Sequence, residues 1–252
     1  MSDTWILLRG LMREQRHWGN FPATLAAALP GANIVTPDLP GTGARHAQDS
    51  ATRVAGMVEL CRQDLLARGL APPYRLLALS LGGMVAVEWA SRYPHEIASC
   101  VLINTSMRPY SPFYRRLRWQ NYPALLRQLL FGNQASQEAL ILRLTSRRHA
   151  AGNPALVGLW VQYQRQYPVS RRNVLRQLLS AARFRAPADK PSMPLLILAG
   201  GRDGLVDPGC SRQLARRWQT AVDIHPAAGH DLPLDQPQWV AQTVAQWLKN
   251  TG

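Results

Sequence analysis

The chain has 252 residues, of which 46% are apolar and 17% are charged, and its formal net charge at pH 7 is +14. This length and composition allow a large buried core, exclude an intrinsically disordered protein, and leave no apolar run of about 18 residues that could span a bilayer. The N-terminal residues lack the features of a signal peptide, so we expect a cytoplasmic protein. The three cysteines form no C-x-x-C pair, and we expect free thiols and no metal site.

The positive charge is concentrated in one third of the chain. Residues 107–190 carry fourteen arginines and one lysine against only two acidic residues, a net charge of +13, whereas the rest of the chain carries +1. The charge alone suggests a nucleic-acid-binding module, but the chain contains no motif of that kind and its flanking parts are electrostatically ordinary. We therefore expect no nucleic-acid partner.

Short apolar runs alternate with amphipathic helical patterns on both sides of the basic segment. Residues 5–8 form an apolar run, and residues 18–29 then carry apolar side chains at helical spacing until Pro30 and Gly31 end the pattern. Apolar strands separated by helices predict an α/β fold with a doubly wound, mainly parallel sheet. The predicted strands are 5–8, 33–36, 74–79, 98–104, 195–199 and 221–225, and the predicted helices are 18–29, 51–68, 81–93 and 237–248.

The basic segment contains no strand pattern. Four helical stretches can be marked in it, at 121–131, 135–148, 155–167 and 170–184. Because the strand pattern resumes afterwards, the sequence predicts one α/β core, residues 1–106 and 191–252, with an inserted helical cap, or lid, at residues 107–190.

Ser80 occupies a turn between a predicted strand and a predicted helix. Ala78 precedes it by two residues and Gly82 follows it by two, which gives the pattern G-x-S-x-G with alanine in the first place. Small residues permit the sharp turn that exposes a nucleophilic serine, and the following helix directs the amide of Leu81 at a developing oxyanion. A bland interpretation is also open, in which the small residues only allow a strand and a helix to pack closely.

A nucleophilic serine needs a histidine base and an orienting acid, and both should follow it in the order Ser, Asp, His. Asp203 follows the predicted strand 195–199, and His230 follows the predicted strand 221–225. Asp207 is a rival acid, but it precedes Pro208 at an apparent helix start, where capping the helix explains it better. The alternative for His230 is an ordinary surface histidine.

The second oxyanion donor should come from the loop after the first strand. Gly10 would let the backbone there approach a substrate, and the amide of Leu11 is the candidate donor. We assign Trp18, at the start of the next helix, no catalytic role.

With Ser80, Asp203 and His230 in place, the chain resembles the α/β-hydrolase fold superfamily. Arg9-Gly10 followed by Trp18 is similar to the His-Gly…Trp oxyanion segment of that superfamily, and residues 37–43 are similar to its D-x-P-G-x-G turn. Two residues depart from the pattern: Arg9 replaces the usual histidine, and Ala78 replaces the first glycine of the serine turn.

The resemblance implies a hydrolase that uses Ser80 as nucleophile, His230 as base and Asp203 as orienting acid, without a metal or an organic cofactor. A serine at position 80 argues against the branches that carry aspartate there, the haloalkane dehalogenases and epoxide hydrolases. Chain length and the basic cap look most like the carboxylesterases similar to pimeloyl-[acyl-carrier protein] methyl ester esterase. Thioesterase, lactonase or perhydrolase activity remains open, and so does a non-catalytic ligand-binding protein on the same fold.

Four cap arginines form like-charge pairs at i, i+4 with no acidic residue beside them: Arg143 with Arg147, and Arg172 with Arg176. Each pair should destabilise a helix by a few tenths of a kcal/mol. One interpretation is a solvated arginine face. The other is an electropositive rim that attracts an acidic acyl carrier protein or an anionic substrate.

Overall fold

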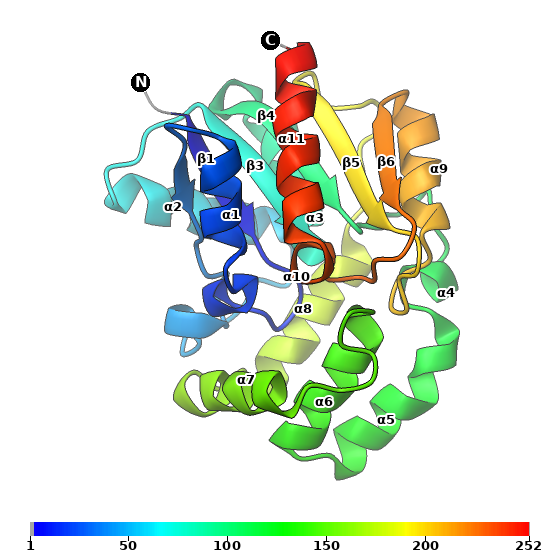
Figure 1. Ribbon diagram of the computed structural model, residues 1–252. Coiled ribbons are helices and arrows are strands. Elements are labelled where there is room, and N and C mark those ends of the chain that lie inside the picture. Colours follow the sequence, from blue (N-terminus) through cyan, green and yellow to red (C-terminus); the bar gives the residue numbers. More distant parts are fainter. Residues whose placement is uncertain (1–2, 252) are drawn as a thin grey trace.

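Six parallel strands form a single sheet in the computed structural model, which describes residues 3–251 (Figure 1). The strand order is β2-β1-β3-β4-β5-β6, so the chain starts near one edge, reverses after β2 and then proceeds to the other edge. This confirms the predicted doubly wound sheet. The strands are β1 Thr4–Leu8, β2 Asn33–Val35, β3 Tyr74–Leu79, β4 Ile97–Ile103, β5 Leu195–Gly200 and β6 Ala221–His225.

Helices flank the sheet on both faces and extend beyond one end of it. The α-helices are α1 Phe21–Ala28, α2 Val54–Ala67, α3 Leu81–Arg92, α4 Phe113–Arg116, α5 Tyr122–Phe131, α6 Gln134–Thr145, α7 Pro154–Gln166, α8 Arg171–Arg183, α9 Gly209–Trp218, α10 Leu232–Asp235 and α11 Pro237–Thr251. Short 3-10 turns cover Gln15–Trp18, Gly43–Arg45, Pro94–Glu96 and Trp119–Asn121.

The core consists of two apolar layers, one on each face of the sheet. Alternate side chains of β1, β3, β4 and β5 point to opposite faces, as strand geometry requires. One face packs against α2, α3 and α9, and the other packs against α1 and α11. The central strands are buried on both faces, which explains why their sequences are continuous apolar runs.

Two helices have bounds in the structure that differ from the predicted ones, each for a local reason. The pattern at 18–29 divides into a 3-10 turn and α1, because Gly19, with a φ of 54°, interrupts the backbone between them. The pattern at 135–148 ends at Thr145, since Ser146 is extended and residues 146–148 donate hydrogen bonds to Asp235.

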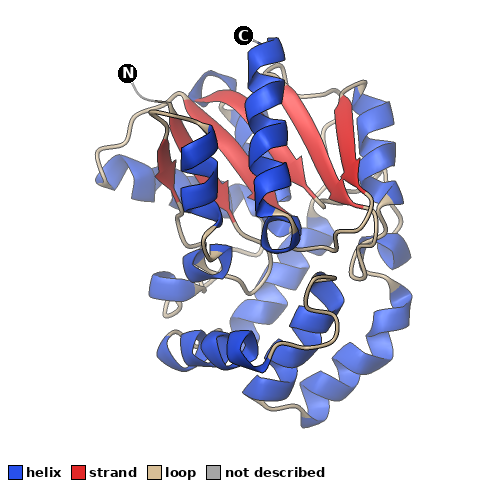
Figure 2. Cartoon of the chain, viewed as in Figure 1, coloured by secondary structure: helices blue, strands red, loops and turns tan. Residues whose placement is uncertain are grey.

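The segment between β4 and β5 is helical, as Figure 2 shows. Its helices α5, α6 and α7 lie beyond the carboxyl ends of the strands (Figure 1). We refer to residues 107–190 as the inserted segment; the division of the chain into a core and a cap at these boundaries stays a prediction.

The three cysteines, Cys61, Cys100 and Cys210, are buried free thiols, and burial raises the pKa of Cys61 to about 12. No helix among residues 3–251 is long and apolar enough to cross a membrane.

Candidate active site

Ser80 lies in a strained turn between β3 and α3. Its φ of 57° and ψ of −114° fall outside the regions that a serine ordinarily adopts, and its N–H donates to the carbonyl of Ile103 at 2.9 Å. Ala78 is fully buried in β3, between Leu8 of β1 and Leu102 of β4 in the sheet register. The turn therefore presents its side chain at the carboxyl edge of the sheet while the residues beside it are enclosed.

Gly82 explains why this turn needs small residues. A Cβ atom at Gly82 would collide with the carbonyl oxygen of Leu8 and would lie 2.8 Å from that of Arg9. Both oxygens belong to the main chain and have little freedom to retreat. The first turn of α3 can therefore approach the end of β1 only without a side chain at this position.

Asp203 and His230 form a hydrogen-bonded pair in the loops that follow β5 and β6. Oδ2 of Asp203 lies 2.7 Å from Nδ1 of His230, and both side chains are almost completely buried. Oδ1 of Asp203 accepts the N–H groups of Leu205 at 2.7 Å and Val206 at 2.9 Å. These bonds fix the position of the carboxylate beside the imidazole ring.

Asn104, which sequence reasoning missed, ties these two loops together. It follows β4 with a φ of 47°, and its Nδ2 donates to the carbonyls of Gly229 at 3.1 Å and His230 at 2.7 Å. Its Oδ1 accepts the N–H of Gly200 at 2.9 Å, at the end of β5. The only sequence signal is a polar residue directly after an apolar strand.

The rival acid Asp207 lies just before α9, and the carboxylate that contacts Nδ1 of His230 is that of Asp203. Its Oδ1 accepts the N–H of Gly209, the first residue of that helix, at 2.8 Å, and its Oδ2 lies 3.7 Å from Nε of Arg115. Asp207 thus accepts the first N–H of α9 from the residue before the N-cap position, which Pro208 occupies.

The loop after β1 lies directly against the serine turn. A Cβ atom at Gly10 would be 3.2 Å from the Cβ of Ser80 and 3.8 Å from its Oγ. The backbone N–H of Leu11, the next residue, is thus near Ser80, and that of Leu81 is one of the unpaired donors at the start of α3. Both candidate oxyanion donors therefore adjoin the serine.

The same loop is held by a helix of the inserted segment. The N–H of Met12, which has a φ of 60°, donates to Oε1 of Gln177 on α8 at 2.9 Å. Gln177 is fully buried, and its Nε2 donates to the hydroxyl of Ser50 at 3.1 Å. Sequence reasoning missed Gln177, because α8 buries a polar stripe and exposes its leucines.

A second contact between the loop and the inserted segment is ionic. Glu138 of α6 is fully buried, and its Oε2 lies 2.6 Å from Nη1 of Arg13. The same Nη1 lies 2.9 Å from Nε2 of His17, and the guanidinium lies 4.7 Å from the ring centroid of Trp160 on α7. One of the two acidic residues of the inserted segment thus faces the core and not the solvent.

The free energy of unfolding should depend on pH through His17, which lies in this ionic cluster. Burial, followed by the charges of Arg13 and Arg9, lowers the pKa of His17 well below 6.5, although a carboxylate oxygen of Glu14 lies 3.7 Å from Nδ1. The unfolded chain therefore binds the proton more readily than the folded chain. Above pH 6.5 His17 is neutral in both states, and the protein has its full stability. As the pH falls below that value, the free energy of unfolding decreases by up to about 1.4 kcal/mol per pH unit.

Urea unfolding at pH 7.5, 6.5 and 5.5 checks this expectation. His17→Gln should lose stability less steeply than the wild type between the last two values. His95→Gln replaces an exposed histidine and should keep the wild-type slope. Equal slopes in His17→Gln and the wild type would contradict the role of His17.

The structure corrects both expectations about the arginine pairs. Arg147 lies beyond the end of α6, so Arg143 and Arg147 are not an i, i+4 pair on one helix. Arg172 and Arg176 do share α8, but Asp49 of the core compensates them: its Oδ2 lies 2.8 Å from Nη2 of Arg172 and 4.0 Å from Nη2 of Arg176. The expectation of an uncompensated repulsion between Arg172 and Arg176 is wrong, because their acidic partner Asp49 lies in a distant part of the chain.

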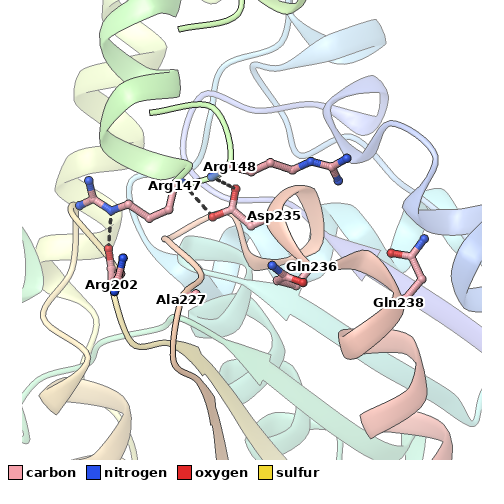
Figure 3. Close-up of a pocket in the computed structure, with 7 residues that line it drawn as sticks. All are labelled: Arg147, Arg148, Arg202, Ala227, Asp235, Gln236 and Gln238. Atoms are coloured by element: carbon pink, nitrogen blue, oxygen red, sulfur yellow. Dashed lines mark hydrogen bonds between the residues drawn. The ribbon is translucent and has the colours of Figure 1, made fainter. Parts of the chain in front are cut away.

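Arg147 instead lines a hollow of about 450 Å³ beside the loops that carry Asp203 and His230 (Figure 3). Its Nε donates to the carbonyl of Arg202 at 2.7 Å, and the side chains of Arg147 and Arg148 extend in opposite directions. Asp235 accepts both of their backbone N–H groups and that of Gly229. The lining residues are Arg147, Arg148, Arg202, Ala227, Asp235, Gln236 and Gln238.

Known proteins are similar to this chain in sequence and in architecture. Pimeloyl-[acyl-carrier protein] methyl ester esterase of Chromobacterium violaceum is 31% identical over 223 residues, which cover 84% of this chain and 82% of that protein. Monoacylglycerol lipase ABHD6 of Mus musculus is 23% identical over 254 residues, which cover 96% of this chain and 74% of that protein. A thermophilic esterase from Thermogutta terrifontis superposes with a TM-score of 0.76 at 23% identity, covering 100% of this chain and 91% of that one.

The family described as "Alpha/beta hydrolase family" matches residues 5–243, almost the whole chain. This match and the 31% identity confirm the resemblance seen in the sequence. The chain belongs to the alpha/beta hydrolase family.

Proposed function

We propose that this protein is a serine carboxylesterase. The observation that supports the proposal most is the 2.7 Å hydrogen bond between Asp203 and Nδ1 of His230, at the same sheet edge as the strained turn of Ser80. With Nδ1 engaged by the carboxylate, Nε2 of the neutral imidazole is left as the base that a serine hydroxyl requires.

The reaction proceeds through an acyl-enzyme. Oγ of Ser80 attacks the ester carbonyl carbon while its proton passes to Nε2 of His230, and the backbone N–H groups of Leu11 and Leu81 stabilise the oxyanion. The imidazolium, stabilised by Asp203, then gives its proton to the departing alcohol as the C–O bond breaks. Water attacks the acyl group with His230 again as base, which releases the carboxylic acid and restores Ser80.

A fluorophosphonate probe tests this proposal. The wild type should be labelled covalently at Ser80, and Ser80→Ala should not. Turnover of p-nitrophenyl esters, acyl thioesters and lactones then assigns the reaction to an esterase, a thioesterase or a lactonase. Absent labelling and turnover in the wild type would favour a non-catalytic ligand-binding protein.

We also propose that the substrate is carried by an acidic protein such as an acyl carrier protein. The relative from Chromobacterium violaceum is named for an ester of that kind. Arg143 and Arg148 are exposed, and so is Arg147, although its Nε donates to the carbonyl of Arg202. Arg147 and Arg148 line the hollow beside the His230 loop, and Arg143 lies in the last turn of α6, which precedes them. Arg172 and Arg176 are engaged by Asp49 and are less available to a partner.

Charge reversal at Arg143 and Arg148 should therefore lower kcat/KM for a carrier-linked ester about 10-fold at an ionic strength that gives a Debye length of about 10 Å. A small neutral ester should be hydrolysed at the wild-type rate by the same double variant. Arg217→Glu, on the exposed side of α9, is the control and should leave both substrates unaffected. Unchanged turnover of the carrier-linked ester in the Arg143/Arg148 variant would exclude this recruitment surface.

A further inference from the structure

We propose that Arg9 and Asp231 are a positioning pair for catalysis: their ion pair holds the loop with the oxyanion donor Leu11 in register with the loop that carries His230. The inference rests on the proposed function. It assigns a role to the arginine that replaces the usual histidine before Gly10, and to an aspartate that sequence reasoning did not single out.

The pair has the geometry of a rigid link. Nη2 of Arg9 lies 2.7 Å from Oδ2 of Asp231, and Nη1 lies 3.2 Å from Oδ1. Two parallel hydrogen bonds between planar groups fix both their distance and their orientation. The side chains are only 4% and 5% exposed, so water competes little for either partner. Trp18 covers the guanidinium, with 4.7 Å between its ring centroid and Cζ of Arg9.

The link joins two loops that the sheet itself keeps apart. β1 and β6 are not neighbours, because β3, β4 and β5 lie between them. Backbone pairing in the sheet therefore cannot fix the distance between the loops that follow these two strands. The ion pair instead links the two loops directly, where they approach each other beyond the ends of the strands.

Each partner is one or two residues from an atom that the reaction uses. Arg9 directly precedes Gly10, which lies against Ser80. The next residue, Leu11, carries the proposed oxyanion donor. Asp231 directly follows His230, and its N–H donates to the carbonyl of Thr145, the last residue of α6, at 2.7 Å. Asn104 holds the backbone of His230 from the end of β4, and the ion pair adds a second constraint from the loop after β1. A small rotation of either loop would change the position of His230 relative to the oxyanion donor.

The test separates positioning from folding. Removing one partner leaves a buried charge without compensation and destabilises the protein, whereas replacing both with apolar groups of similar volume is commonly tolerated. The main variant is therefore Arg9→Met with Asp231→Leu. Arg9→Lys, which keeps the charge but not the bidentate geometry, is the second variant. Arg62→Met with Glu96→Leu removes another ion pair, between α2 and the turn before β4, and is the control.

Fluorophosphonate titration counts the active sites in each preparation, so that kcat is expressed per active site. For a p-nitrophenyl ester we expect the Arg9/Asp231 double variant to lose about 10- to 100-fold in kcat with little change in KM. The Ki of an aryl trifluoromethyl ketone, which forms an oxyanion adduct with a serine, should rise by a similar factor. The control pair should change neither quantity.

A purely structural role predicts a different result, namely fewer active sites with a normal kcat and Ki for each of them. That result in the Arg9/Asp231 double variant would overturn the proposal. If the double variant does not fold, Arg9→Lys decides: a wild-type kcat per site overturns the proposal, and a reduced kcat at constant KM supports it. A wild type that the probe does not label contradicts the proposed function itself, which these variants do not test.

Discussion

Ser80→Ala should lower kcat/KM for a p-nitrophenyl ester by about 10⁴- to 10⁶-fold and leave the protein folded, because alanine removes only the hydroxyl. The expected loss is large because each step of the proposed reaction passes through the Ser80 oxygen. His230→Ala should lose a similar factor, and Asp203→Asn about 10³- to 10⁴-fold, since the amide holds the imidazole in the wrong tautomer. Steady-state kinetics and thermal unfolding of each variant check both expectations.

The three substitutions should not be additive, because the residues act as a unit. A triple variant should retain about the activity of Ser80→Ala. Asp207→Asn is the matched control: it changes a carboxylate four residues from Asp203 that caps α9, and it should keep most of the wild-type activity. Loss of activity in Asp207→Asn with retention in Asp203→Asn would transfer the role of the acid to Asp207.

The elements of the sheet could be predicted because their signals are local. Each central strand is a short apolar run between turn residues, and helices on both faces make the pattern continuous. The positions of Ser80, Asp203 and His230 followed from the same signals, since the carboxyl ends of parallel strands meet at one edge. Ser80 and His230 are 150 positions apart in the chain. This separation did not hinder the prediction, because each residue was located from the strand that precedes it.

What the sequence left undetermined is the pairing of residues far apart in the chain. Asp49 neutralises Arg172, and Glu138 pairs with Arg13 across 125 residues. Helical spacing describes neighbours on the same helix only, so it predicted repulsion where the fold supplies a counter-charge. Arg9 could be recognised as a departure from the family pattern, but its partner Asp231 could not be identified without the structure.

The stretch predicted to be helical at 170–184 is α8, but its sequence does not reveal which face is buried. Asn173, Gln177 and Ser180 are buried along one stripe, whereas Leu175 on the other side is 62% exposed. The surface that α8 covers consists of loops with free backbone groups: Asn173 alone binds the N–H of Ser50 and the carbonyl of Gln48. A buried polar group is stable when it is hydrogen-bonded, so this interface selects amides where a sheet would select leucines.

The tight contact between β1 and α3 leads to the second large effect, at Gly82. Gly82→Ala should destabilise the protein by about 2–3 kcal/mol and lower kcat/KM by more than about 100-fold. Alanine favours a helix over glycine by about 1 kcal/mol, so a loss of stability would mean that the steric conflict outweighs the propensity. The conflict is with the backbone of Leu8 and Arg9, directly before Gly10 and Leu11. Relieving it would therefore displace the loop that carries the proposed oxyanion donor Leu11.

Gly158→Ala supplies the matched control, because Gly158 lies within α7 and a Cβ atom there would meet nothing within 4 Å. That variant should be more stable than the wild type by about 0.5–1 kcal/mol and equally active. Denaturant unfolding and steady-state kinetics of the two alanine variants make the comparison direct. If Gly82→Ala were as stable and as active as Gly158→Ala, the end of β1 would not be in close contact with the serine turn, and the oxyanion site would have to be built elsewhere.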